Sequence, residues 1–498
     1  MLHSRPKVTG VTVAALGLAA LSLTAPGSPT AAAAAPVFRP AVSDYAQVSA
    51  SETPPTQAQC NSVGRRCFNP ASTRAAYNVD PLIQNGVDGR GVTIAIVDSF
   101  GSDTIAHDLH VYNQTWGLPP MCGEEGVTCA AGMPTFSQFH FQGAPATKPN
   151  PGKGPGQEDK SAWALEVSLD VETAHSMAPG ANILLVTTPT AETLGVQGLP
   201  TMMKAEKYVV DHHMADVISQ SFGTAEDAFG SKQSLLNLRD AFTAAAANGV
   251  TVLASSGDDG SAGTSKQPVG KGGAVLPNPT VGWPASDPLV TGVGGTYLCT
   301  DATATSGRIL DTANPPVNCQ PPNTQAEVAW IDAGGGYSHV FSRPSYQNTL
   351  PAGSTAIPQT ARGVPDIGLQ ASSRTGALVY LTLPPDGNSG LICGSAPCST
   401  GWYDIGGTSL SCPQWAGLVA LADQLNGGDL GLINPALYKV ASNAGQYAAD
   451  YYDVTTGNNG AFAPDVPGYP ATTGWDPVTG LGTPNAAALL PALVAASH

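Results

Sequence analysis

Val92-Thr93-Ile94-Ala95-Ile96-Val97 is a short apolar run of mostly β-branched residues, and a glycine-rich turn at 88–91 precedes it. Such a run predicts a central, buried strand. Similar runs follow, and they alternate with stretches of helical spacing. The expected strands are 182–186, 217–219 and 250–254, and the expected helices are 161–177, 235–247 and 411–425. This alternation predicts an α/β fold, with a parallel sheet covered by helices on both faces.

The composition is acidic and low in charge. Charged residues make up 12% of the chain, with 37 Asp and Glu against 21 Lys and Arg. An average globular protein has roughly 25%. Because there is no basic patch to neutralise phosphates, nucleic acid is an unlikely partner class. The acidic balance favours a protein that works in acidic surroundings.

The first residues have the order of a secretory signal. Basic residues occur within 1–7, an apolar stretch covers 8–25, and small residues fill 31–35. This order predicts a signal peptide at 1–35 and a secreted, extracellular protein. A membrane anchor is the alternative, but the apolar stretch is short and diluted by Gly, Thr and Ser. Residues 36–67 are poor in pattern, so we expect a short flexible leader there.

Nine cysteines in an exported chain predict disulfides. Eight of them form local couples that would each close a polar or glycine-rich loop. The expected pairs are Cys60 with Cys67, Cys122 with Cys129, Cys299 with Cys319, and Cys393 with Cys398. Cys412 remains as a buried free thiol. The spacings lack the paired pattern of a zinc site.

Ser409 is a candidate nucleophile. It follows Gly406-Gly407-Thr408 and precedes an apolar helix, so the backbone can turn sharply and present the hydroxyl where the helix begins. The helix N-terminus offers N–H groups and a positive dipole end to a developing oxyanion. The alternative is a serine that merely caps the helix, so the interpretation depends on partners.

A serine hydroxyl needs a base, and carboxylates stand where a histidine segment would be expected. Glu166 and Asp170 are four residues apart and share one face of a helix. Two such carboxylates repel each other when ionised, so one should have a raised pKa and be a usable base. A solvated acidic helix face is the alternative. A histidine-based site would instead use Asp98 and His175, but His175 lacks flanking glycines and is expected to be structural.

Asp258 follows the strand at 250–254, in Ser255-Ser256-Gly257-Asp258. A subtilisin-like layout supplies an Asn here, whose amide stabilises the oxyanion. An Asp can donate a hydrogen bond only when it is protonated. The residue therefore predicts a working range in acid.

These segments resemble the sedolisins, the serine-carboxyl peptidase family, over 68–498. The matching motifs, whose joint order is specific, are Glu166 with Asp170, Ser256 to Asp258, Gly407 to Ser409 with Pro413, Trp283 to Ser286, Val293 to Thr296, Gly334 to Gly336, and Arg362 to Asp366. The resemblance implies a subtilisin-like parallel sheet in a single large catalytic domain. It implies Ser409 as nucleophile, Glu166 as base, Asp170 as the partner that orients Glu166, and Asp258 as oxyanion donor. Sedolisins commonly carry a long pro-domain, and 36–67 is shorter than that.

The resemblance also implies one structural Ca²⁺ near the C-terminus. Its oxygen ligands would be the carboxylates of Asp453 and Asp476 and the carbonyls of Val454, Thr472 and Gly474. The family commonly has Gly where Thr472 stands.

We therefore expect a secreted, acid-acting serine peptidase that cleaves protein or peptide substrates through an acyl-enzyme on Ser409. We expect a monomer, with no nucleic acid and no membrane contact after signal cleavage. A catalytically inactive relative that binds peptides or cell-wall material is the alternative from another class.

Overall fold

The protein is described here by a computed structural model that covers residues 44–143, 157–189, 198–264, 275–313, 315–383, 391–393, 395–460 and 463–498. The predicted signal peptide at 1–35 lies outside the described residues. Residues from Ala35 to His498 belong to one compact unit. Within the described ranges, no helix combines the length and the apolar character needed to cross a membrane.

The centre of this unit is a sheet to which the described residues contribute eight strands. In spatial order they are β10 (Glu327–Ala329), β9 (Thr291–Leu298), β7 (Thr251–Ser255), β5 (Val217–Gln220), β2 (Thr93–Ser99), β4 (Asn182–Thr188) and β3 (Phe136–His140), with β13 (Ile367–Gln370) also paired to β9. Only the β10 pairing is antiparallel. The predicted central strand at 92–97 is β2, and the predicted fold class is confirmed.

Side chains of β2 alternate between two separate cores. Ile94 and Ile96 belong to one apolar cluster, and Ala95 and Val97 belong to another. Neighbouring strands do the same, so both faces of the sheet are buried. This explains why the strands are continuous apolar runs.

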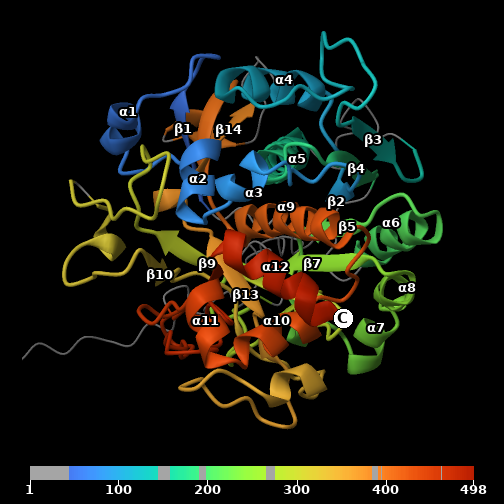
Figure 1. Ribbon diagram of the computed structural model, residues 1–498, viewed down its shortest axis with the longest axis vertical. Helices are drawn as coiled ribbons and strands as arrows, with labels where there is room; N and C mark the ends of the chain where they lie inside the picture. The colour runs from blue at the N-terminus through green and yellow to red at the C-terminus, as the bar shows by residue number, and fades with distance from the viewer. Residues whose placement is uncertain are drawn as a thin grey trace, which may run out of the picture. The chain divides into compact units, whose positions relative to one another are not determined.

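Helices cover both faces of the sheet (Figure 1). On one face lie α5 (Gln157–Met177) and α9 (Thr408–Asn426), with α12 (Ala486–Ser497) and α10 (Asn434–Ala441) outside α9. On the other face lie α6 (Leu199–Asp211) and α8 (Asp240–Asn248). The remaining described α-helices are α1 (Gln57–Ser62), α2 (Pro70–Ala76), α3 (Asp80–Gln84), α4 (Ile105–Trp116), α7 (Lys232–Leu236) and α11 (Ala444–Asp450).

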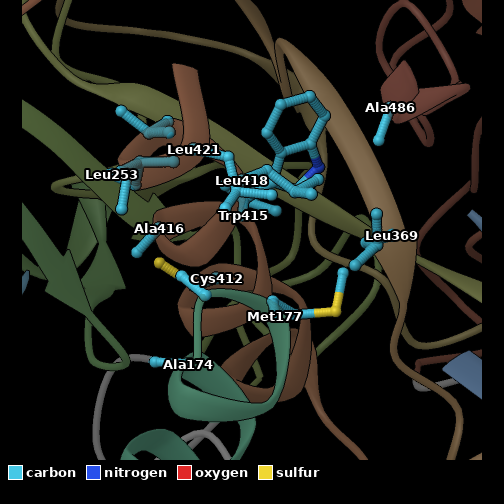
Figure 2. Close-up of a cluster of buried hydrophobic side chains, with 14 of the residues drawn as sticks. Ala174, Met177, Leu253, Leu369, Cys412, Trp415, Ala416, Leu418, Leu421 and Ala486 are labelled. Carbon is cyan, nitrogen blue, oxygen red and sulfur yellow. The ribbon is translucent and has the colours of Figure 1, made fainter. Parts of the chain in front are cut away.

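The close packing of α9 on α5 fixes the helices that carry the candidate catalytic residues. Figure 2 shows Ala174 and Met177 of α5 beside Cys412 and Trp415 of α9. A Cβ added to Gly417 would lie 2.7 Å from the Cβ of Met177, so this glycine permits the close approach. A larger residue here would force the two helices apart.

The helix expected at 235–247 is divided into α7 and α8. The chain turns at 237–239, and Arg239 there forms an ion pair with Asp287, with Nε–Oδ2 2.5 Å and Nη2–Oδ1 2.8 Å. Asp240 then begins α8, where its negative charge suits the helix N-terminus. Helical spacing continues across the break, so the sequence pattern did not reveal it.

A smaller sheet corrects the prediction of a flexible leader at 36–67 for residues 44–67, while 36–43 lie outside the described residues. Its strands are β1 (Tyr45–Ser49), β17 (Gly401–Ile405) and β14 (Ala377–Leu381), with β17 in the middle. The described part of the leader thus contributes a strand and the helix α1, which begins with a capping box at Thr56. The segment is ordered because β1 pairs with β17, about 350 residues away in the sequence. The composition of the leader alone therefore does not predict a strand there.

Several two-residue strand pairs hold loops around the unit. They are β6 (Thr224–Ala225) with β8 (Gly282–Trp283), β11 (Gly336–Tyr337) with β12 (Gly363–Val364), β15 (Ile392–Cys393) with β16 (Ala396–Pro397), and β18 (Tyr451–Tyr452) with β19 (Thr483–Pro484). All four predicted disulfides are confirmed, and Cys412 is free and buried.

Candidate active site

Ser409 lies in the first turn of α9, directly after strand β17. Gly407 precedes the helix with φ 111°, a backbone conformation that favours glycine. A Cβ on Gly406 would lie 2.2 Å from the Ser373 nitrogen and 2.4 Å from the Ala371 carbonyl oxygen. Only glycine fits this turn without moving the neighbouring loop. Because Gly407 is the N-cap, Ser409 does not cap the helix, and its hydroxyl has no hydrogen-bond partner among the described residues.

Glu166 and Asp170 lie on α5, one turn apart, and both side chains are 0% exposed. The alternative of a solvated acidic helix face is therefore wrong. This part of the helix is buried on opposite sides, because Val167 and Val171 belong to one apolar cluster and Leu165 and Leu169 belong to another. The carboxyl groups are enclosed between α5, α9 and the ends of the parallel strands.

The pKa values of these carboxyl groups are strongly displaced. Burial raises the pKa of Glu166 well above its usual range, and the charges of Asp170 and Asp98 raise it further. The Ser409 hydroxyl faces Glu166 and lowers that pKa, although the two groups do not complete a hydrogen bond of ordinary geometry. Burial also raises the pKa of Asp170, followed by the charge of Asp98, while the Ser221 hydroxyl opposes the rise.

Asp98 is a third carboxyl group in this cluster, at the carboxyl end of β2. Sequence reasoning named it only as the possible partner of a catalytic histidine. The side chain is 0% exposed, neither carboxyl oxygen has a hydrogen-bond partner among the described residues, and burial raises its pKa to about 8. Asp98, Glu166 and Asp170 therefore titrate together and share protons. The sequence could have indicated this role, because Asp98 follows a central parallel strand, and side chains at the ends of neighbouring parallel strands converge.

Asp258 approaches Ser409 from the loop after β7. Its Oδ1 accepts hydrogen bonds from the backbone N–H and the hydroxyl of Thr408, both at 2.8 Å. Thr408 Oγ1 in turn accepts from the Gly257 N–H at 3.0 Å. Burial raises the pKa of Asp258 to about 7, and the bonds from Thr408 oppose the rise. Oδ2 has no partner within the described part of the chain, so a proton there is free to be donated.

Ser221, after β5, completes the arrangement. Its hydroxyl donates to the Ser409 carbonyl oxygen at 3.4 Å. The same hydroxyl lowers the pKa of Asp170. The structure thus brings together Ser409, Glu166, Asp170 and Asp258, as the sequence predicts, and adds Asp98, Ser221 and Thr408. Such a cluster can take up a hydroxyl proton at Glu166 and stabilise a developing oxyanion from Asp258 and the start of α9.

His175 takes no part in this cluster. It lies on α5, buried, and its Nε2 is 3.1 Å from the Pro119 carbonyl oxygen. Burial lowers its pKa to about 4, so it stays neutral over most of the pH range. It is nine residues from Glu166 on one helix, which is about 13 Å along the axis. This agrees with the structural role expected for it.

The predicted calcium ligands lie on two neighbouring loops. The Gly474 N–H donates to Asp453, with 3.1 Å to Oδ1 and 3.0 Å to Oδ2, and the Thr472 N–H donates to Asp476 Oδ2 at 3.1 Å. Asp453 and Val454 also line a cavity of about 740 Å³. Among the described residues no cluster of three or more His, Cys, Asp or Glu side chains is suited to a metal.

The donor set suits Ca²⁺ in its chemistry, since it offers two carboxylates and backbone carbonyls. However, Asp476 already accepts bonds from the N–H groups of Val478 and Thr479, at 2.8 and 2.9 Å, and from the Thr479 hydroxyl at 3.0 Å. Asp453 has fewer donors and is the more available ligand.

The parallel sheet and the buried serine at the start of its central helix define a subtilisin-like protein. A family model described as "Subtilase family" matches residues 146–439. Kumamolisin from Bacillus sp. (strain MN-32) is 30% identical over 449 residues, which are 88% of this chain and 66% of the relative. Human tripeptidyl-peptidase 1 is 31% identical over 348 residues, which are 68% of this chain and 53% of the relative.

Among solved structures, Pseudomonas sedolisin, a serine-carboxyl proteinase complexed with pseudo-iodotyrostatin, matches with a TM-score of 0.61 and 26% identity. That match covers 86% of this chain and 98% of the sedolisin chain. The chain therefore belongs to the subtilase family, in its sedolisin branch of serine-carboxyl peptidases. It spans about half to two thirds of the length of the curated relatives it matches.

Proposed function

We propose that the protein is a serine-carboxyl peptidase that cleaves peptide bonds in acid. The observation that carries this proposal is the set of three buried carboxyl groups, Glu166, Asp170 and Asp98, next to Ser409. The active form is the one in which Glu166 is ionised while Asp170 and Asp98 hold protons, and Glu166 then takes the hydroxyl proton as Ser409 Oγ attacks the peptide carbonyl. Asp170 orients Glu166, and Asp98 keeps a proton available to the pair.

Asp258 stabilises the oxyanion of the tetrahedral intermediate in this mechanism. It donates from Oδ2 while Oδ1 stays bound to Thr408, so the donor is held in place before the reaction. The proton on Glu166 then passes to the leaving amine, which departs and leaves an acyl group on Ser409. Water, with Glu166 again as base, releases the product acid.

Activity should be confined to acid, because Asp258 donates to the oxyanion only while it is protonated. The pKa of Asp258 is about 7, so its donor is lost at higher pH. We expect cleavage of a denatured protein or a mixed peptide library at pH 3–5, and a rate at least about tenfold lower at pH 8. Mass spectrometry of the products measures this and also defines the preferred cleavage site. Cleavage only at pH 8 would reject the carboxylate mechanism, and no cleavage at any pH would favour an inactive, peptide-binding relative.

Export is part of the proposal. Four disulfides close loops of the described chain, which suits an oxidising compartment, and the first 35 residues have the order of a signal peptide. The substrates are then proteins or peptides outside the cell, and the working form is a monomer.

We also propose one structural Ca²⁺ at Asp453, Val454, Thr472, Gly474 and Asp476. Calcium added to chelator-treated protein should raise the melting temperature, since a ligand at 100 times its Kd stabilises by about 2.7 kcal/mol. Differential scanning fluorimetry measures the shift. Asp453→Asn should remove most of it, whereas Asp465→Asn, an exposed residue nearby, should not. An identical shift in both variants would place the calcium elsewhere, and no shift in wild type would exclude the site.

A further inference from the structure

Asp44, at the start of strand β1, contacts the turn that carries the nucleophile. Its carbonyl oxygen accepts the Gly406 N–H at 3.4 Å. Its side chain accepts a hydrogen bond from the Ser373 hydroxyl. One residue of the N-terminal segment thus binds both the turn before Ser409 and the loop behind that turn.

Arg65 holds the Asp44 carboxylate in a two-point ion pair. Nη1–Oδ2 and Nη2–Oδ1 are both 2.9 Å, and the Arg65 side chain is only 7% exposed. The backbone around Arg65 is itself fixed, because the Arg65 N–H donates to the Cys60 carbonyl at 3.0 Å and Cys60 is bonded to Cys67. Such paired geometry is specific as well as strong.

The Gly406–Gly407 turn is also fixed on the side that faces loop 371–373. The Gly407 N–H donates to the Ala371 carbonyl oxygen at 2.6 Å, and Gly406 packs on the Ser373 backbone too closely for any side chain. The Gly406–Gly407 turn is therefore held between loop 371–373 and Asp44. Displacement of this turn would carry Thr408 and Ser409 with it, and with them the contact to Asp258.

We propose that Asp44 and Arg65 form a positioning pair for the nucleophile, which locks the Gly406–Gly407 turn so that Ser409 faces Glu166. This inference rests on the proposed peptidase function. Neither residue touches the reacting atoms, so the pair acts through the backbone. Its effect should therefore appear in kcat, since a displaced nucleophile lowers the rate without changing substrate binding.

The charges around the pair keep it intact in acid. Burial alone would raise the pKa of Asp44, but Arg65, the Ser373 hydroxyl and Arg374 lower it below its usual value. Asp332, whose own pKa Asp44 raises, also faces the pair. Asp404 of β17 lies beside it, 0% exposed and without hydrogen-bond partners in the described chain, and burial raises its pKa well above the usual range. The raised pKa of Asp404 favours its neutral form in acid, whereas the lowered pKa of Asp44 keeps it as the anionic partner of Arg65 at the acid pH where Asp258 holds its proton.

The test compares Asp44→Asn with wild type in steady-state cleavage of one peptide at pH 4. We expect kcat to fall by about 10- to 100-fold and KM to change less than about twofold. The double variant Asp44→Ala/Arg65→Met should show the same loss without leaving a buried, unpaired arginine. Asp311→Asn is the matched control, because it removes a different ion pair of the same segment, between Arg66 Nε and Asp311 Oδ2 at 2.8 Å, and leaves the Asp44–Arg65 pair in place.

Amide hydrogen exchange of peptides that cover 401–410 gives a readout that does not depend on activity. We expect faster exchange in Asp44→Asn and unchanged exchange in Asp311→Asn. Unchanged kcat and exchange in Asp44→Asn, in an active wild-type background, would overturn the positioning role and leave the proposed function standing. If wild type cleaves nothing and Asp44→Asn still exchanges faster than wild type, the proposed function fails, the pair is only a structural contact, and its catalytic role is rejected.

Discussion

Replacing Ser409 by alanine is expected to reduce peptide cleavage at pH 4 by about four to six orders of magnitude, as loss of the nucleophile does in other serine peptidases. The melting temperature should stay within about 2 °C, because the hydroxyl has no hydrogen-bond partner among the described residues. Glu166→Gln should reduce the rate almost as far, because an amide cannot take the hydroxyl proton. Both effects are measured as kcat/KM with one fluorogenic peptide.

Two control variants distinguish the loss of a catalytic group from the loss of any buried polar side chain. Ser411→Ala removes a buried serine two residues on, whose hydroxyl donates to the Gln370 carbonyl oxygen at 3.0 Å, outside the carboxyl cluster. Glu206→Gln changes a glutamate on α6 that is also 0% exposed and whose oxygens likewise have no partner among the described residues. Both should keep kcat within about threefold of wild type. Residual cleavage above about 1% in Ser409→Ala would reject the serine as nucleophile.

The protein should be most stable in mild acid and lose stability as the pH rises towards 8. Burial raises the pKa of Asp98 and Asp423 to about 8 and that of Asp258 to about 7. A carboxyl group with a raised folded-state pKa binds its proton more tightly in the folded protein. Its stabilisation is complete below the unfolded pKa of about 4 and is lost as the pH rises through the folded pKa.

Three groups oppose this trend, and only at lower pH: His175, Asp44, and Asp88, whose pKa is lowered by its hydrogen bond from Arg90. The pKa of His175 is lowered to about 4, so its contribution rises with pH only up to about 6.5. The pKa of Asp44 is lowered, so its ion pair is lost only in stronger acid. The melting temperature should therefore peak near pH 4–5 and fall by roughly 10 °C by pH 8. Scanning calorimetry in buffers of equal ionic strength measures this, and Asp98→Asn should flatten the decline. A melting temperature that rises from pH 5 to pH 8 would contradict the buried, protonated cluster.

The sequence predicted those elements and site residues whose pattern lies within a few neighbouring positions. The apolar run of β2, the glycines before Ser409 and the spacing of Glu166 and Asp170 each follow from a few neighbouring residues. The disulfides followed in the same way, since each joins cysteines no more than 20 residues apart.

The parts that were missed depend on contacts between distant residues. Asp98 joins the cluster because β2 lies between β4 and β5 in the sheet, an order that the sequence alone does not determine. The segment from residue 44 onward is ordered because it pairs with β17. The hydrogen bond from Thr408 to Asp258 joins residues that are 150 apart in the sequence. Propensity and periodicity describe windows of about 10 to 20 residues, so they carry no information on such pairings.

The proposed base, Glu166, and the proposed nucleophile, Ser409, are about 240 residues apart in the sequence, and this affects the newly made protein. Glu166 lies on α5 and Ser409 on α9, and α9 is in turn packed beneath α12 near residue 490. A ribosome has to complete nearly the whole sequence before these groups can meet, since a chain that ends before α9 contains the carboxyls but no serine to activate. In the proposed mechanism, a chain that ends before α9 would therefore lack the nucleophile and could not cleave itself or its neighbours.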